Sequence, residues 1–125
     1  MTNSDLQPGP EADARIAQAM GWITGDDGTG RTTWFDPRNP DVEIWPCPGF
    51  TTDDRWIGLM LEWLTARCNS VNLDFFDDDK WRICGWIRPG LCKASNRQVI
   101  IEAPTLHEAV WRCLLAVAER ESERP

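Results

Sequence analysis

The stretch VNLDFFDDDKWRICGWI, from Val71 to Ile87, predicts two antiparallel strands that fold back on each other across a polar turn. Val71, Leu73 and Phe75 alternate with polar residues, and the return strand repeats the period of two. We therefore expect this hairpin to have one apolar face. Because a lone hairpin is only marginally stable in water, other elements of the chain must cover that face.

Helical segments on both sides of the hairpin can supply this cover. Thr51–Cys68 opens with Thr and Asp residues suited to the start of a helix and is apolar around most of its circumference. Thr105 and Glu108 form a capping box that predicts a last helix ending near Glu119. The apolar face predicted for this helix consists of Leu106, Ala109, Val110, Cys113, Leu114 and Val117. A shorter helix is predicted over Glu11–Met20.

The remaining strands are short. Gln98–Glu102 alternates again and predicts a third strand of the main sheet. Trp22–Thr24 and Arg31–Phe35 flank the turn residues GDDGTG and predict a small hairpin, and Val42–Trp45 predicts an edge strand between prolines. The order of elements predicts an α+β fold with an antiparallel sheet between helices.

We expect helices on both faces of the sheet, an α/β/α sandwich, because Trp86 and Phe76 fall on the nominally polar side of the hairpin. Residues 1–10 are polar and rich in turn formers, which predicts a flexible N-terminal arm. Residues 11–120 then form a single domain, and residues 121–125 are expected to fray.

Composition narrows the functional classes. The net charge of −7 disfavours direct nucleic-acid binding, which depends on Lys and Arg, and favours a basic partner. No window predicts a membrane span or a signal peptide, so a cytoplasmic protein is expected. The five Cys lack CxxC spacing, which predicts buried free thiols rather than disulfides or a metal site. We expect no cofactor.

Catalytic motifs are weak. Gly25–Thr32 is close to a phosphate-binding loop, but Arg31 replaces the essential lysine and a strand follows where a helix should begin. His107 is the single histidine, and Cys113 lies six positions further on, toward the opposite face of the same predicted helix. An enzyme is therefore not expected.

Exposed aromatic and acidic residues are the candidates for partner binding. Aromatic residues on short strands are hard to bury completely, although they can equally form the core of the small hairpin. The acidic candidates lie in and beside the hairpin turn, where a solvated turn is the simpler interpretation and a cation site the alternative. The candidates are Trp34, Phe35, Trp45, Asp74, Asp77, Asp78 and Asp79.

Several phrases occur in an order that resembles the phage ABA-sandwich domain family. They are ARIAQAMGW (Ala14–Trp22), PGFTTD (Pro48–Asp53) and APTLHEAVWRCLLAVAE (Ala103–Glu119). The resemblance covers residues 11–120, and this chain departs from it by its longer GDDGTG hairpin and by Phe50–Thr51 in place of Tyr-Ser. It implies a helix–sheet–helix sandwich encoded by a phage or prophage, and it supplies no catalytic residues.

With this resemblance, a binding protein is the leading hypothesis: a counter-defence inhibitor that blocks a host protein, for example one with a basic nucleic-acid-binding surface. An accessory or structural phage protein is an alternative. A second alternative is a sponge for a nucleotide-type ligand, which needs Arg31, Arg38 or Arg82 close to Trp34 or Trp45. The chain is expected to be a monomer, or a homodimer through the edge strand at Val42–Trp45.

Overall fold

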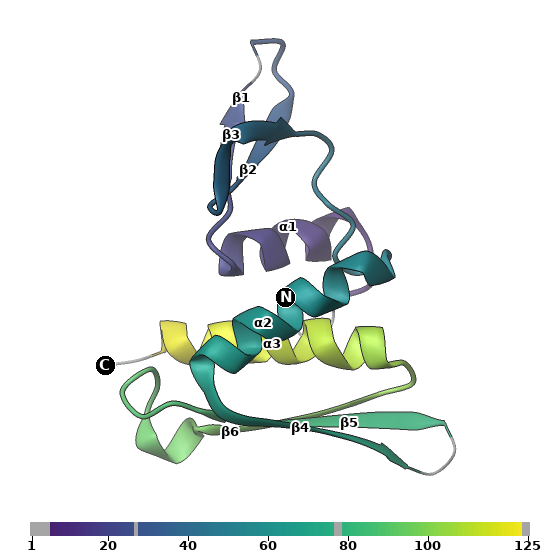
Figure 1. Cartoon of the computed structure of the whole chain (residues 1–125), viewed down its shortest axis with the longest axis vertical. Coiled ribbons are helices and arrows are strands. Elements are labelled where there is room, and N and C mark those ends of the chain that lie inside the picture. Colours follow the sequence, from purple (N-terminus) through teal and green to yellow (C-terminus); the bar gives the residue numbers. More distant parts are fainter. Residues whose placement is uncertain (1–5, 27, 77–78, 124–125) are drawn as a thin grey trace.

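The computed structural model describes residues 6–26, 28–76 and 79–123, which form three α-helices and two antiparallel three-stranded sheets (Figure 1). The α-helices are α1 (Pro10–Ala19), α2 (Ile57–Arg67) and α3 (Leu106–Ser122). The strands are β1 (Ile23–Asp26), β2 (Thr32–Asp36), β3 (Asn39–Ile44), β4 (Cys68–Phe76), β5 (Lys80–Ile87) and β6 (Gln98–Ala103). Two short 3-10 turns, η2 (Asp54–Trp56) and η3 (Ala94–Asn96), complete the elements. The predicted α+β class is confirmed.

The main sheet has the order β4-β5-β6, with β5 at its centre. In the β4–β5 hairpin Leu73 lies opposite Ile83 and Phe75 lies opposite Trp81. On the other side of β5, Ile83 lies opposite Ile101 of β6. The predicted hairpin and the third strand of the meander are therefore confirmed.

All three α-helices lie on one side of this sheet (Figure 1). Helix α3 packs on β5 and β6, α2 packs on β4, and α1 packs against α3 on the side away from the sheet. On the opposite face Trp86 and Ile100 are 41% and 52% exposed, and no α-helix of the described residues covers them. Cover on both faces, and with it the α/β/α sandwich, is not confirmed.

Helix α3 is the centre of the hydrophobic core. Ala109, Cys113 and Leu114, which belong to its predicted apolar face, are completely buried. Trp111 and Leu115 are also buried, although they lie outside that predicted face. The reason is that α3 has the sheet on one side and α1 on the other, so more than one stripe of the helix is removed from water.

The apolar face of the hairpin is only partly covered. Leu73 is 40% exposed and Phe75 is 54% exposed, although both lie on the side of the sheet that carries the helices. Strand β4 is at the edge of the sheet, so its side chains have sheet neighbours on one side only. The Phe75 ring packs on Trp81, with 5.1 Å between the ring centroids.

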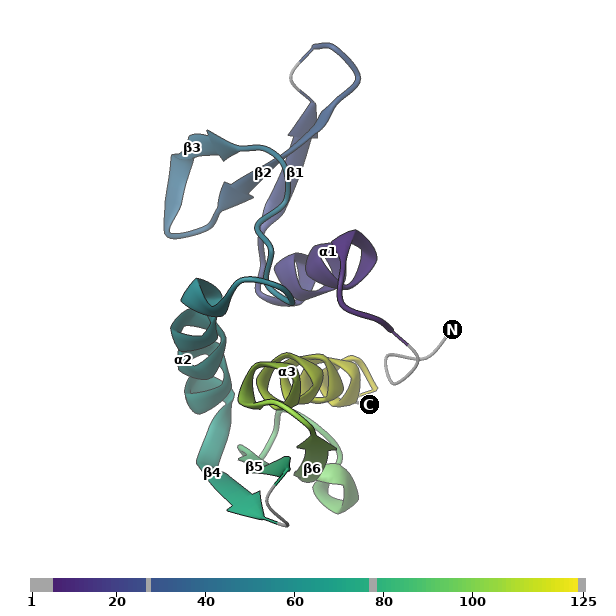
Figure 2. The same ribbon diagram turned by 90° about the vertical axis from the view of Figure 1, so that its right-hand side faces the viewer.

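The second sheet, β1-β2-β3, extends beyond α1 and away from the main sheet (Figure 2). The predicted small hairpin is confirmed, with Thr24 opposite Trp34. Strand β3 is an edge strand, as expected, and begins at Asn39. Pro40 therefore lies in a strand whose outer side has no sheet partner, which is a position that tolerates proline.

Buried polar contacts join the N-terminal segment to the loop before α2. The Asp13 side chain, 6% exposed, accepts hydrogen bonds from the backbone nitrogen and the hydroxyl of Thr51, both at 2.8 Å. The Gly9 backbone nitrogen donates to the Thr51 hydroxyl at 2.9 Å. The helix predicted from Thr51 starts later than expected: η2 begins at Asp54, where the Asp53 side chain accepts a hydrogen bond from the Arg55 backbone nitrogen, and α2 begins at Ile57.

The termini of the domain are held more firmly than expected. Leu6 is 2% exposed, and its carbonyl oxygen accepts a hydrogen bond from Arg112 at 2.9 Å. Within the expected loose arm Leu6 is therefore packed, whereas Gln7, Pro8 and Pro10 are exposed and residues 1–5 lie outside the described residues. At the other end α3 continues to Ser122, and Glu121 pairs with Arg67 at 3.2 Å, so the helix extends past the predicted start of the frayed tail.

Candidate functional site

The aromatic candidates divide between core and surface. Trp34 is 6% exposed and belongs to the hydrophobic core, and Phe35 is half-buried. Trp45 is 54% exposed and follows β3. Of the three aromatic candidates, Trp45 alone is largely exposed to solvent. Trp34 instead belongs to the core, which was the alternative interpretation of this residue.

The acidic candidates lie elsewhere. Asp74 on β4 and Asp79 before β5 are exposed, whereas Asp77 and Asp78 lie outside the described residues. The small sheet and the strands β4 and β5 lie toward opposite ends of the long axis of the molecule (Figure 1). Trp45 and the described acids therefore do not form one surface.

The arginine required by the nucleotide-type hypothesis is present beside Trp45. The Arg31 guanidinium carbon lies 4.3 Å from the centre of the Trp45 ring. Arg82 instead lies over Phe76, at 4.4 Å, and Arg38 pairs with Asp36. Because the Trp45 ring is largely exposed, the Arg31–Trp45 pair is a surface contact rather than the wall of a pocket.

His107 and Cys113 are not brought together in a cleft. The two ring nitrogens of His107 contact the Phe50 carbonyl oxygen at 2.6 Å and the Asp54 carboxylate at 2.9 Å. Cys113 is completely buried. This histidine therefore links the start of α3 to the loop before α2.

All five cysteines are free thiols: Cys68, Cys92 and Cys113 are buried, and Cys47 and Cys84 are partly exposed. Within the described residues no group of three or more His, Cys, Asp or Glu side chains is placed to hold a metal ion. None of the described helices is both long enough and apolar enough to cross a membrane.

Burial raises the pKa of the Cys113 thiol to about 12, from 9.0 in an exposed thiol. The folded state thus retains a proton that the unfolded chain loses first, so the free energy of unfolding should fall between about pH 9 and pH 12. Cys113 contributes up to about 1.4 kcal/mol per pH unit to this slope. Urea unfolding across this range should show a shallower slope for Cys113→Ala, whereas Val117→Ala, a core truncation without a titrating group, should keep the wild-type slope. Equal slopes in the two variants would contradict the assignment.

The open face of the main sheet carries an apolar pair and a charged row. Cys84 lies opposite Ile100, and Trp86 lies one pair further along β5, opposite Gln98. Trp86 and Ile100 are therefore diagonal neighbours on the same face, within reach of each other's side chains. The sequence pattern identified Trp86 as a residue on the polar side and did not single out Ile100.

The charged row lies beside this pair. Asp74, Arg82 and Glu102 lie opposite one another across the three strands. Arg82 donates to the Glu102 carboxylate at 3.2 Å. Two carboxylates flank one guanidinium, so the described part of this row carries a net negative charge.

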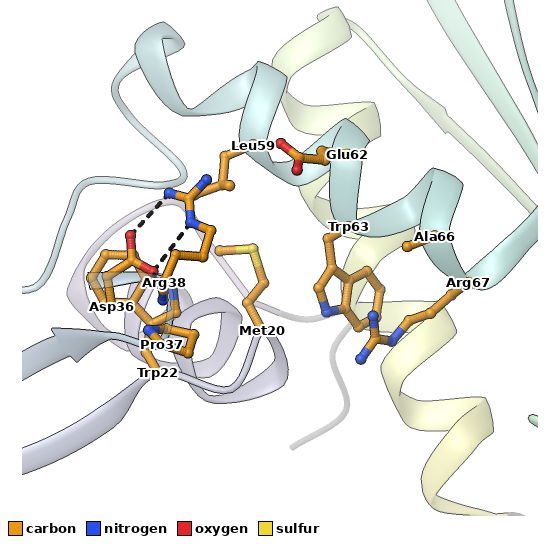
Figure 3. A pocket seen from close by; sticks show the side chains of 10 residues that line it. All are labelled: Met20, Trp22, Asp36, Pro37, Arg38, Leu59, Glu62, Trp63, Ala66 and Arg67. Atoms are coloured by element: carbon orange, nitrogen blue, oxygen red, sulfur yellow. Dashed lines mark hydrogen bonds and ion pairs between the residues drawn. The ribbon is translucent and has the colours of Figure 1, made fainter. Parts of the chain in front are cut away.

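A pocket of about 190 Å³ lies between the β2–β3 connection, the end of α1 and helix α2 (Figure 3). Its apolar walls are Met20, Trp22, Pro37, Leu59, Trp63 and Ala66. The sequence did not indicate this pocket, because its lining residues come from three separated segments without a shared local pattern.

Ion pairs surround the pocket. Arg38 donates to both carboxylate oxygens of Asp36, at 3.2 and 2.9 Å, and these hydrogen bonds hold the pKa of Asp36 below its ordinary value. Arg67 stacks on Trp63, with 4.0 Å from the guanidinium carbon to the ring centre, and pairs with Glu121. Glu62 also contributes to the lining. The rim therefore has matched positive and negative charges.

Comparisons of the chain with protein-family models, with curated proteins and with solved structures found no match. The resemblance to the phage ABA-sandwich family therefore remains an expectation from sequence phrases. The class that the structure itself defines is an α+β protein in which the described α-helices cover one face of the main sheet.

Proposed function

We propose that this chain is a small acidic binding protein that docks on a partner protein through the open face of the β4-β5-β6 sheet. The observation that carries the proposal is the exposure of Trp86 and Ile100, 41% and 52%, side by side on a face without helical cover. Aromatic residues are enriched among the side chains that dominate binding energy at protein interfaces.

Charge favours a basic partner. The chain has a net charge of −7, and Asp74 and Glu102 lie on the same face, in the charged row beside the apolar pair. Such a charge distribution speeds association with a positively charged surface and disfavours acidic partners. A partner with a basic nucleic-acid-binding surface has this chemistry.

The proposed effect is inhibition by occlusion. A chain that covers a basic groove prevents nucleic acid from entering it, without any catalysis. The family resemblance points to a bacterial host protein as the partner, in the bacterial cytoplasm, and to a counter-defence role. A nucleotide-type sponge has less support, because the Arg31–Trp45 pair lies on an exposed surface.

The partner can be identified by cross-linking from the proposed face. A photoreactive benzoylphenylalanine in place of Ile100 should capture a protein from bacterial lysate that the same probe in place of Ile23 does not capture. Ile23 is a suitable control because it is 60% exposed on the other sheet. Equal capture from both positions, or capture from neither, would argue against the proposed face.

Affinity for the captured and purified partner then tests the role of Trp86. Trp86→Ala should weaken binding by roughly 30-fold, the equivalent of about 2 kcal/mol for an interface hot spot. Ile23→Ala should bind as the wild type does, and added salt should slow association. A Trp86→Ala variant that binds the partner with wild-type affinity would refute the proposal. Nucleic-acid binding by the partner, measured with and without the chain, tests the proposed inhibition.

A further inference from the structure

The outer edge of strand β4 is a long margin of the main sheet without a neighbouring strand. β4 has 9 residues, and among the described strands it pairs with β5 alone. Figure 2 shows β4 at the left-hand margin of the main sheet, with no described helix or strand beyond it. An edge strand presents backbone N–H and C=O groups with which another extended chain can form hydrogen bonds.

Most of β4 lacks the features that usually protect an edge strand. Natural edges are shielded by Lys or Pro, by bulges, or by a short length. Strand β3, at the edge of the small sheet, contains Pro40. The sequence of β4, CNSVNLDFF, contains neither Lys nor Pro, and its register shift lies at its start, between Cys68 and Ser70. Residues 71–76 are therefore regular and accessible to pairing.

On the helix side of this stretch two large apolar side chains lack a neighbour from an outer strand. Leu73 and Phe75 are 40% and 54% exposed. Helix α2 is close to β4 at the start of the strand and rises away from it toward Phe76 (Figure 1). Directly opposite residues of paired strands have their Cβ atoms about 4.5–5.5 Å apart. An added strand with apolar residues at alternate positions would therefore cover Leu73 and Phe75.

On the open side of β4 the complementary charge is positive. Asp74 is exposed, and the Arg82 opposite it donates a hydrogen bond to Glu102 and stacks on Phe76. A Lys or Arg of an added strand would pair favourably with Asp74. A second copy of this chain would not supply it through β4, which contains no Lys or Arg, and it would add a further net charge of −7.

We propose that the outer edge of β4 binds an extended segment of a partner protein in which basic and apolar residues alternate. The segment pairs with residues 71–76 as a fourth strand of the main sheet. Its apolar side chains cover Leu73 and Phe75, and its basic side chains face Asp74. Trp86 and Ile100 lie on β5 and β6, so this edge is a separate surface and the inference goes beyond the function proposed above.

The heptapeptide Lys-Val-Lys-Val-Lys-Val-Lys, labelled with a fluorophore, is a suitable probe because valine favours strands and the alternation matches the edge. Fluorescence anisotropy with the full chain should show saturable binding with a Kd below about 1 mM. The rearranged peptide Lys-Lys-Val-Val-Val-Lys-Lys should bind at least several-fold more weakly, and so should the first peptide with Pro at its central position. Absence of saturable binding, or equal binding of the rearranged peptide, would overturn the proposal.

Variants of the chain locate the peptide. Phe75→Lys should weaken binding at least ten-fold, because it replaces an exposed apolar partner by a like charge, and Asp74→Asn should weaken binding several-fold. Val42→Lys makes the same change of charge at a 45% exposed position of the edge strand β3 and should bind as the wild type does. Trp86→Ala should also retain wild-type peptide binding, which separates this edge from the open sheet face. A loss for Val42→Lys or Trp86→Ala as large as that for Phe75→Lys would refute the site.

Two further measurements test the mode of binding and the occupant. The backbone amide signals of residues 71–76 should shift in the NMR spectrum of the peptide complex and exchange more slowly with solvent, because pairing protects edge amides. Unchanged signals in this stretch would overturn strand addition. Sedimentation equilibrium of the chain alone should give the monomer mass. A dimer that Phe75→Lys dissociates would assign the edge to a second copy and would also overturn the proposal.

Discussion

Phe50→Ala is expected to lower the free energy of unfolding by about 3–5 kcal/mol, the usual cost of removing a large buried ring. Phe50 is completely buried in an aromatic cluster, with its ring centroid 5.5 Å from that of Trp22 and 5.1 Å from that of Trp56. A domain of this kind is typically stable by only about 5–15 kcal/mol, so the loss should be readily visible in urea unfolding.

The Phe50 substitution isolates the ring from the backbone. The carbonyl oxygen of Phe50, which contacts His107, is retained in the variant. Trp45→Ala is the matched control, because it removes an even larger ring that is 54% exposed and should cost below about 1 kcal/mol. Similar free energies of unfolding for Phe50→Ala and Trp45→Ala would contradict the packing of Phe50 in the aromatic cluster.

Asp13→Ala is expected to cost about 2–4 kcal/mol. The substitution leaves the backbone N–H and the hydroxyl of Thr51 without their shared acceptor, and Asp13 and Thr51 are both 6% exposed. Hydrogen bonds to a charged group contribute about 1.5–3 kcal/mol, and a buried donor left unpaired adds its desolvation cost. The loss should appear as a clear decrease in the thermal midpoint.

Two variants test the specificity of this effect. Asp13→Asn keeps an oxygen acceptor and should lose about half as much stability as Asp13→Ala. Glu11→Ala removes a carboxylate that is 62% exposed from the same helix and should change stability by at most about 0.5 kcal/mol. A loss for Glu11→Ala as large as that for Asp13→Ala would show that helix charge, rather than the Thr51 contacts, is responsible.

Signals carried by a few neighbouring residues predicted the elements well. Thr105 accepts a hydrogen bond from the Glu108 backbone nitrogen at 3.1 Å, as the capping box indicated, and α3 begins at the next residue. The period-two pattern of residues 71–87 corresponds to β4 and β5. Caps and alternation depend on backbone geometry within one element, and this geometry is encoded locally.

Burial was predicted less well, because it depends on which elements meet. Leu73 and Phe75 have the same alternation as the buried Ile83, but they lie on an edge strand and remain exposed. Trp34 lies on a short strand of the small sheet and is nevertheless buried. Alternation indicates which side chains share a face, and it does not indicate how far the covering helices extend.

The candidate sites were the features that the sequence predicted least well. The pocket brings Met20, Arg38 and Trp63 together from three segments of the chain that no local pattern connects. Trp86 and Ile100 become neighbours only through the pairing of β5 with β6. Both sites are consequences of tertiary packing.

Local sequence thus determined the helices, the strands and the α+β class of this protein, because hydrogen-bonded periodicity and helix caps act over a few residues. Tertiary structure alone decided that the helices gather on one side of the main sheet and leave Trp86 and Ile100 exposed. It also left Leu73 and Phe75 exposed at the edge of this sheet. The physical reason is that burial, exposure and pocket formation depend on contacts between elements that are distant in the chain.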